Sequence, residues 1–297
     1  MTEFLQYVFN GLANGGVYAT LALALVLIHR ATGIVNFAQG EMGMFATFIA
    51  WSLTNHHGLP YWVAFFLTLL IAFLGGAAVH QVVIHPLERG SALTVVMATI
   101  ALLIILNGLA GWIWAPEVKF LKSPFPLKVL HVGGVVMNVQ DLGVIGVSLA
   151  CVVIVFGFFR FTRLGLMMRA SAVGPATSRL IGIRVGLMLS IGWGLAAMLS
   201  AVSGMMAVAT PSIQLDPNFM LVILTYSFAA AVLGGIDSPV GSVVGAFLIG
   251  IGISLLSGYA SSFLGTELQL PVALAMLLIV LVVRPAGLFG RVVVRRV

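Results

Sequence analysis

The sequence predicts an all-α polytopic membrane protein, a bundle of about eight or nine transmembrane helices with a short helix outside the bilayer. Hydrophobic residues make up 61% of its 297 residues and charged residues 7%, with a mean hydropathy of +1.17. A chain of this composition cannot cover itself with polar side chains in water. Apolar runs of about 20 residues, long enough to cross a bilayer, recur along its length. We expect residues 1–297 to form a single transmembrane domain.

The apolar runs are expected to be helices, because every backbone amide in lipid must be hydrogen-bonded within its own segment. The short alternating strands of an outer-membrane barrel are absent from the sequence. The run that begins at residue 36 starts with polar residues, which leaves open whether it crosses fully or is a half-helix. The expected spans are 7–28, 36–54, 61–84, 92–114, 141–159, 187–210, 219–236, 240–258 and 269–284.

The distribution of arginine predicts the orientation. Five of the eleven arginines lie in the 160–187 loop, which has no acidic residue. Short loops rich in basic residues favour the cytoplasm. Placing this loop inside puts all eleven arginines on the cytoplasmic side, the N-terminus outside and the C-terminus inside. The three lysines then lie in the long outer loop, 115–140, whose prolines and Gly133-Gly134 pair indicate an irregular or short-hairpin cap.

Two residues of the basic loop predict a helix that lies off the membrane. Pro175 suits the first position of a helix, and Gly182 suits the residue just past its end. They frame a short helix at about 175–181. This helix is either a docking element for a partner or a connector whose arginines only fix the topology, and the pattern leaves both alternatives open.

Small residues recur at spacings that let helix backbones approach closely, which indicates a tightly packed bundle. The pairs are Gly11 and Gly15, Gly182 and Gly186, Gly241 and Gly245, and Gly250 and Gly252.

The sequence shows almost none of the groups that an enzyme needs. The pair His56-His57 falls in an outer loop, and His80 and His85 lack the spacing of metal ligands with a carboxylate. A single cysteine, Cys151, excludes an internal disulfide and a cysteine-based metal cluster. No nucleophile elbow or phosphate-binding loop occurs. We expect no catalytic, cofactor or metal site in this chain.

The net charge of +6 does not indicate a nucleic-acid partner, because the basic residues are dispersed over the loops of an integral membrane protein. Beside anionic lipid they act as topology determinants. We therefore expect the lipid bilayer, and no nucleic acid, as the partner of these charges.

The most polar patch beside an apolar run is Asn36-Phe37-Ala38-Gln39-Gly40-Glu41. An acid in the first turn of a helix is favoured by the unpaired amides there, which gives Glu41 a purely structural role. The functional alternative is that a polar break at membrane depth lines a cavity. Candidate cavity or gate residues are Asn36, Gln39, Glu41 and Asn107, although Asn107 is equally suited to bond a neighbouring helix.

Four signatures in this sequence resemble the membrane permeases of the branched-chain amino acid class of ABC importers. They occur in the order of that family and span nearly the whole chain. The signatures are Asn14–Ala19 with Gly33–Glu41, Gly165–Ala172 with Leu180–Ile183, Gly234-Gly235 with Ser238–Gly241, and Arg284–Gly290. Two departures stand out: Gln39 replaces the usual histidine, and Val173-Gly174-Pro175 replaces an acidic or amide residue.

The resemblance implies half of an importer channel in the bacterial cytoplasmic (inner) membrane. It implies a homologous second permease, two cytoplasmic ATPase subunits that bind ATP and Mg, and an external substrate-binding protein. Branched-chain or related amino acids are the implied substrates, and some members carry urea or short amides. The residues implied to couple the basic loop to the ATPase are Arg169, Ala170, Ala172, Pro175, Arg179, Gly182 and Ile183.

An ion-coupled secondary transporter or channel is the alternative from a different class. Such a protein exposes its own coupling carboxylates or pore-lining charges inside its spans, and Glu41 is the one acid expected within the thickness of the membrane. An intramembrane enzyme needs paired acids or a nucleophile with a base at membrane depth, and the sequence shows neither. The importer permease is the favoured interpretation.

Overall fold

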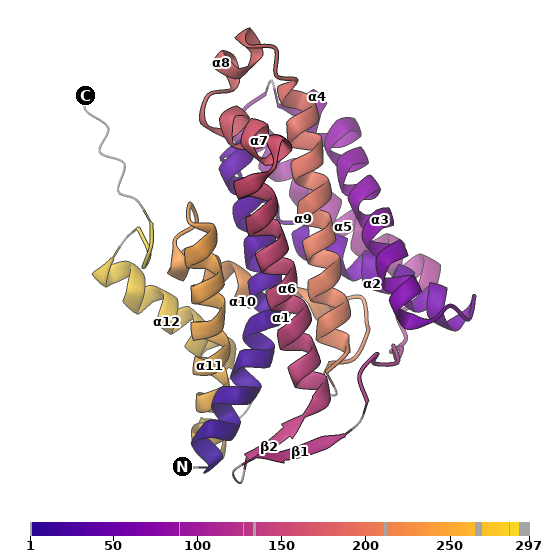
Figure 1. Cartoon of the computed structure of the whole chain (residues 1–297), viewed down its shortest axis with the longest axis vertical. Coiled ribbons are helices and arrows are strands. Elements are labelled where there is room, and N and C mark those ends of the chain that lie inside the picture. The colour runs from indigo at the N-terminus through magenta and orange to yellow at the C-terminus, as the bar shows by residue number, and fades with distance from the viewer. Residues whose placement is uncertain are drawn as a thin grey trace.

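A computed structural model describes residues 2–88, 90–126, 128–132, 135–210, 213–264, 269–284 and 286–290. These residues are mostly helical, and the long helices run side by side along the molecule (Figure 1). The elements are α1 Thr2–Thr32, α2 Gln39–Asn55, α3 Tyr61–Val79, the π-helical segment η1 His80–Ile84, α4 His85–Leu87, α5 Ala92–Trp114, β1 Val129–Val132, β2 Val135–Asn138, α6 Val139–Phe161, α7 Arg163–Val173, α8 Pro175–Leu180, α9 Val185–Val208, α10 Phe219–Gly234, α11 Pro239–Leu264 and α12 Gln269–Val283.

The all-α polytopic membrane fold is confirmed. Six of the described helices are long and apolar enough to cross a membrane, namely α1, α3 with its continuation to Leu87, α5, α6, α9 and α11. Helices α10 and α12 are apolar but shorter. Each of the nine expected spans coincides with a helix. Helix α2 is unbroken over 17 residues, about 25 Å at 1.5 Å per residue, so its polar start does not interrupt it.

Helix α1 is the centre of the bundle. Within its most apolar stretch 83% of the residues are buried, against 17% for α5 and for α6, and it packs against α6, α9, α10 and α11. Its glycines explain the closest of these contacts. A Cβ atom on Gly11 would lie 2.5 Å from the Cα of Ile251, and one on Gly15 would lie 3.0 Å from the Cα of Phe247. The Gly11 and Gly15 pair therefore permits the α1–α11 crossing, as its spacing predicts.

The Gly182 and Gly186 pair does not serve the same purpose. Gly182 has φ +84° and no atom near the position of a Cβ, and a Cβ on Gly186 would make only ordinary contacts. The prediction of close helix packing at this pair was wrong, because Gly182 is a turn residue that needs a left-handed backbone.

A short antiparallel hairpin forms the cap expected in the 115–140 loop. Strands β1 and β2 pair from Val129 opposite Asn138 to Val132 opposite Val135. Lys119 and Leu215 exchange backbone hydrogen bonds of 2.8 and 3.2 Å, which tie this loop to the segment before α10. We refer to this end of the bundle as the hairpin end and to the other as the α8 end.

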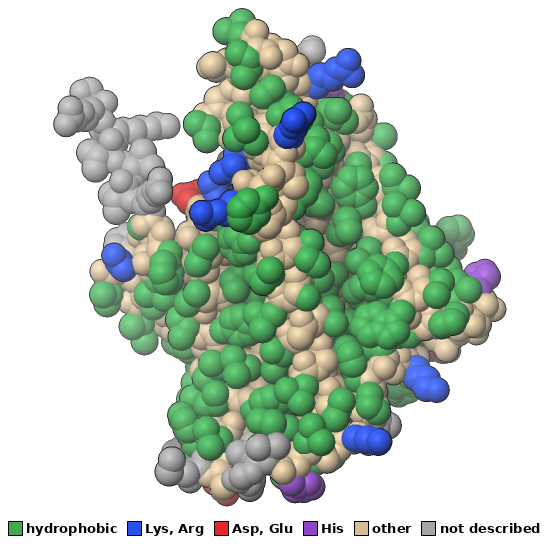
Figure 2. All heavy atoms as spheres, in the orientation of Figure 1, with side chains coloured by type: hydrophobic (Ala, Val, Ile, Leu, Met, Phe, Trp, Pro, Cys, Tyr) green, Lys and Arg blue, Asp and Glu red, His purple; other side chains and the backbone are tan. Residues whose placement is uncertain are grey.

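The surface between the two ends is mainly hydrophobic in Figure 2, and basic side chains border it near α7 and α8 and again at the opposite end. This is the surface expected of a protein that spans a bilayer. Several residues of the predictions, among them the Gly133-Gly134 pair and four arginines, lie outside the described residues. The arginines are Arg89, Arg291, Arg295 and Arg296.

Candidate functional site

Two short helices at the α8 end replace the loop expected between spans. Helix α6 ends at Phe161, and Thr162 caps α7 by accepting a 3.0 Å hydrogen bond from the amide of Gly165. Gly165 is buried against α6, where a Cβ would lie 2.6 Å from the Cα of Phe159. A residue without a side chain is therefore required for α7 to fold back on the end of α6.

Helix α8 forms the tip of this end. It begins at Pro175, and Gly182 follows it with φ +84°, so the helix predicted at about 175–181 is confirmed. The amide of Ile183 donates to the carbonyl oxygen of Ser178 at 3.0 Å, which closes the turn into α9. Large apolar side chains around the tip are strongly exposed: Val173 88%, Leu180 87% and Ile181 70%. Exposed apolar clusters of this kind mark surfaces for partner proteins.

A cavity of about 670 Å³, here called the inner cavity, lies between this tip and the polar start of α2. Its wall includes Pro175 and Arg179 of α8, Asn36 before α2, Glu88 before α5 and Thr99 within α5. The volume is within the range of small-molecule sites, about 300–1,000 Å³. The cavity thus connects the tip of the α8 end with one of the predicted gate residues.

Asn36 and Gln39 form a buried hydrogen-bonded cluster with α9. The side-chain amide of Asn36 donates to Gln39 Oε1 at 2.7 Å. Gln39 Nε2 donates to the carbonyl oxygen of Ala196 at 2.9 Å and to Ser200 Oγ at 2.6 Å. Both side chains are fully packed, with Asn36 1% and Gln39 0% exposed. The cluster therefore fixes the start of α2 against α9.

Glu41 and Asn107 form a second cluster, between α2, α5 and the segment before α10. Asn107 Nδ2 lies 3.4 Å from Glu41 Oε2 and donates to the carbonyl oxygen of Pro217 at 2.8 Å. It also lies 3.3 Å from Oδ1 of the exposed Asn218. Glu41 is 1% exposed, and its Oε1 has no hydrogen-bond partner among the described residues. A buried carboxylate oxygen without a partner is costly unless another group meets it.

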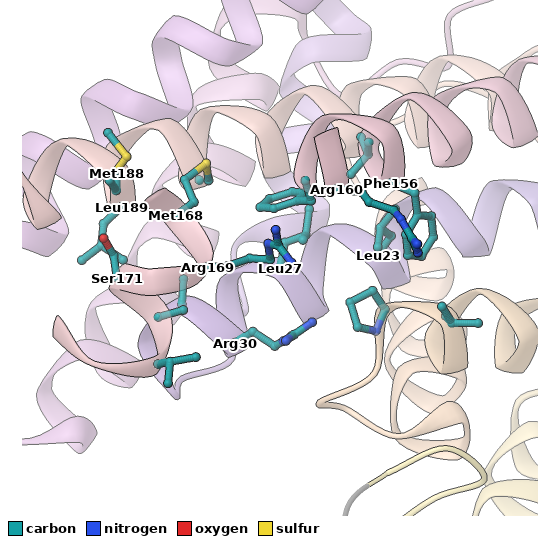
Figure 3. Close-up of a pocket in the computed structure, with 18 residues that line it drawn as sticks. Leu23, Leu27, Arg30, Phe156, Arg160, Met168, Arg169, Ser171, Met188 and Leu189 are labelled. Carbon is teal, nitrogen blue, oxygen red and sulfur yellow. The ribbon is translucent and has the colours of Figure 1, made fainter. Parts of the chain in front are cut away.

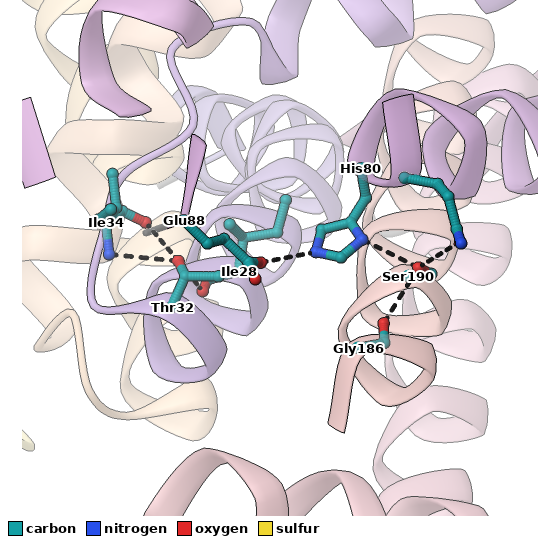
Figure 4. Close-up of polar contacts among 8 residues, drawn as sticks. Ile28, Thr32, Ile34, His80, Glu88, Gly186 and Ser190 are labelled. Atoms are coloured by element: carbon teal, nitrogen blue, oxygen red, sulfur yellow. Dashed lines mark hydrogen bonds and ion pairs between the residues drawn. The ribbon is translucent and has the colours of Figure 1, made fainter. Parts of the chain in front are cut away.

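A third polar cluster centres on His80, in the π-helical segment that continues α3. Its Nε2 lies 2.9 Å from Glu88 Oε1, and its Nδ1 lies 2.9 Å from Ser190 Oγ (Figure 4). Ser190 also lies 3.2 Å from Gln81 Oε1 and 3.1 Å from the carbonyl oxygen of Gly186. π-helical segments often occur at functional sites. The cluster joins the end of α3 to the first turns of α9, directly after the α8 turn.

The chain matches the family described as "Branched-chain amino acid transport system / permease component" over residues 7–281. It belongs to this family. One relative is the high-affinity branched-chain amino acid transport system permease protein LivH of Salmonella typhimurium, 26% identical over 99% of this chain and 98% of that protein. BraD of Pseudomonas aeruginosa, with the same description, is also 26% identical over 99% and 98%. The probable branched-chain amino acid transport permease LivH of Methanocaldococcus jannaschii is 27% identical over 91% and 87%.

Among solved structures, PsaBC from Streptococcus pneumoniae in complex with Fab is similar to this permease-family chain with a TM-score of 0.47 and 15% identity. The likeness covers 93% of this chain and 90% of that chain.

The predicted coupling residues lie in three different places. Pro175 and Arg179 line the inner cavity. Arg169 and Ala172 of α7 line a different cavity, beside α1 and α6. Gly182 and Ile183 form the turn into α9, and the carbonyl oxygen of Ala170 accepts the amide of Gly174 at 3.0 Å at the end of α7.

His80, Glu88 and Ser190 are the residues of this permease-family chain that sequence reasoning missed. The spacing of its histidines excludes a metal site but does not reveal a hydrogen-bonded cluster. A polar residue in the last turns of an apolar span, followed by an acid eight residues later, was the signal available in the sequence.

Proposed function

We propose that this chain is a membrane-spanning permease subunit of an ATP-driven importer for branched-chain amino acids. The match over residues 7–281 to the permease component of such systems carries the proposal. Relatives named for the transport of branched-chain amino acids align with the chain over nearly their whole length, which supports the substrate class.

The proposed assembly contains a homologous second permease, two ATPase subunits that bind ATP and Mg, and an external substrate-binding protein, in the bacterial cytoplasmic membrane. The α8 end faces the cytoplasm and the N-terminus faces outward in this arrangement. The concentration of arginine at the α8 end supports that orientation. The chain has no phosphate-binding loop of its own, so the driving force comes from the ATPases.

The proposed coupling surface is the exposed tip of the α8 end, Val173, Leu180 and Ile181, together with the predicted coupling residues. Closure of the ATPases moves α7 and α8 and rocks the helices joined to them, α6 and α9. Because Pro175 and Arg179 line the inner cavity, such a movement changes the shape of that cavity. The inner cavity is then the inward half of the passage, and the His80 cluster transmits the motion of α9 to α3.

The Glu41 and Asn107 cluster is the proposed gate. Glu41 is buried and has an unpartnered oxygen, while the neighbouring Asn218 is exposed. A carboxylate in this position attracts the ammonium group of an amino acid when the helices separate. The aliphatic part of the substrate then contacts the apolar walls of the bundle.

Uptake by the complete transporter in proteoliposomes tests this function. With radiolabelled leucine, the binding protein outside and ATP on the ATPase side, we expect uptake that requires ATP and is inhibited by isoleucine and valine. Excess urea should not compete. Uptake driven by a proton or sodium gradient without ATP would establish the secondary transporter instead, and preferred uptake of urea would refute the amino acid assignment.

A further inference from the structure

A second cavity at the α8 end, here called the arginine cavity, borders the proposed coupling surface at Arg169, Ala172 and Val173. Its volume is about 680 Å³, and it lies between α1, α6, α7, α9 and the start of α11. Arg30, Arg160 and Arg169 reach it from α1, α6 and α7 (Figure 3). Three separate helices therefore supply one cation each to the same opening.

These three arginines make no ion pair within the described part of the chain. No acidic residue lines the arginine cavity. Asp237, near the start of α11, does not line the cavity, and its Oδ1 lies 3.7 Å from His29 Nε2. Arg30 and Arg169 have no hydrogen-bond or ion-pair partner among the described residues, and Arg160 has only a cation–π contact with Phe161, 5.8 Å from the ring centroid. Guanidinium groups without an ion-pair partner that line one cavity attract an anion.

The remainder of the wall is apolar. Behind the arginines lie Leu23, Leu27, Phe156, Met168, Met188 and Leu189. The surface beside the cavity is apolar too, since Ile154 of α6 is 67% exposed, Phe161 81% and Leu166 of α7 59%. The cavity is therefore charged at its rim and apolar inside. The helices beside it have exposed apolar faces that are suited to contact with lipid.

We propose that the arginine cavity binds an anionic phospholipid, with the phosphate against Arg30, Arg160 and Arg169 and an acyl chain against the apolar wall. Basic pockets between transmembrane helices suit anionic headgroups, and each arginine near an anionic surface contributes about a fivefold gain in binding. Soluble phosphate satisfies the rim but leaves the apolar wall exposed, so the lipid is the better ligand. The proposal does not depend on the transported substrate.

Native mass spectrometry of the full-length chain, purified with the subunits that accompany it, tests the proposal. The probes are dioleoyl phosphatidylglycerol, which is anionic, and dioleoyl phosphatidylcholine, which is zwitterionic. The cavity variant is Arg30→Gln with Arg160→Gln, and Arg169 is kept because it belongs to the proposed coupling surface. The matched control is Arg163→Gln with Arg184→Gln, which removes the same charge from the same end but outside this cavity.

We expect the wild type and the control to prefer phosphatidylglycerol, and the cavity variant to bind it about 25-fold more weakly, from two arginines at about fivefold each. Gly192→Phe provides a second variant with unchanged charge. Gly192 lines the cavity, and a Cβ there would meet only Met168 Cε, at 3.4 Å. Its side chain fills the space of the acyl chain and should also reduce lipid binding.

Several results would overturn the proposal. Equal losses of phosphatidylglycerol binding in the cavity variant and the control would show a general effect of surface charge. Displacement of the lipid by inorganic phosphate would indicate a free-anion site. Loss of a co-purifying subunit with unchanged lipid binding would assign the arginines to a protein partner. If the double arginine variant does not fold, full lipid binding by Gly192→Phe would still exclude the site.

Discussion

At the scale of single residues, a substitution of Glu41 distinguishes a structural role of this side chain from a functional one. As a first-turn acid of α2 it contributes about 0.3–1 kcal/mol to stability through the unpaired amides there. As a gate it makes a charge-assisted contact with the substrate, worth about 1.5–3 kcal/mol, or roughly 10- to 100-fold. We predict that Glu41→Gln lowers leucine uptake at least about tenfold with little change in thermal stability in detergent. Glu117→Gln, at an exposed acid of the 115–140 loop, is the control.

A drop in thermal stability with normal uptake would assign Glu41 to helix stabilisation alone.

The His80 cluster gives a prediction about coupling between residues. His80 is 0% exposed and holds Glu88 and Ser190 at 2.9 Å each. Substitutions of residues in one such network do not have additive effects on the free energy of unfolding, and their interaction energies are about 0.5–3 kcal/mol. In a double-mutant cycle of His80→Phe and Glu88→Gln, measured by unfolding in detergent, we expect the double variant to be less destabilised than the sum of the single variants. Additive effects would mean that the hydrogen bond contributes nothing.

The sequence was informative about polar residues only where they stand out locally. Asn36, Gln39 and Glu41 interrupt an apolar run, so a cavity or a contact between helices was predictable there. Their partners were not: Gln39 bonds Ala196 and Ser200, more than 150 residues away, and no local pattern specifies that pairing. For the same reason Ser190 gave no sign that it meets His80.

At the scale of elements, the junction of α6 and α7 depends on one glycine. A Cβ on Gly165 would collide with the backbone of Phe159. Overpacking of this kind costs about 1–3 kcal/mol or more, and here it displaces α7 and with it the tip. We predict that Gly165→Val greatly reduces ATP-dependent uptake and lowers the melting temperature. Gly157→Val, in the neighbouring helix α6, is the control for the same substitution, because a Cβ at Gly157 has no atom within 4 Å.

Equal losses of uptake from both substitutions would show that the replacement of a helical glycine by valine, and not the α6–α7 junction, causes the effect.

The elements were predictable where hydropathy defines them. All nine expected spans coincide with helices, because each must bury an apolar run and satisfy its own backbone. Helix α7 was not predicted, since its arginines and low hydropathy suggested a loop. The side-chain cap at Thr162 three residues before Gly165 was a local signal of its start. The hairpin and α8 were predicted from proline and glycine, which restrict the backbone directly.

At the scale of the whole molecule, the two ends of the bundle have different surfaces. The α8 end carries arginines and an exposed apolar tip, whereas the hairpin end carries the lysines of the 115–140 loop. The sequence predicts this polarity from charge counts. It does not predict that α1 is the central helix, because all the spans are apolar and only packing distinguishes the buried helix from the peripheral ones.

We propose that separate ATPase subunits drive this permease through the tip of the α8 end. Co-purification of the ATPase subunits, with ATP-dependent leucine uptake by the same preparation, tests it most directly in a variant carrying Leu180→Asp and Ile181→Asp. Phe120→Asp, at a residue 74% exposed in the 115–140 loop, is the control. We expect the tip variant to insert normally but to lose both the ATPase subunits and uptake, while the control keeps both. Normal ATP-dependent uptake by the tip variant would show that the ATPases do not act through this tip.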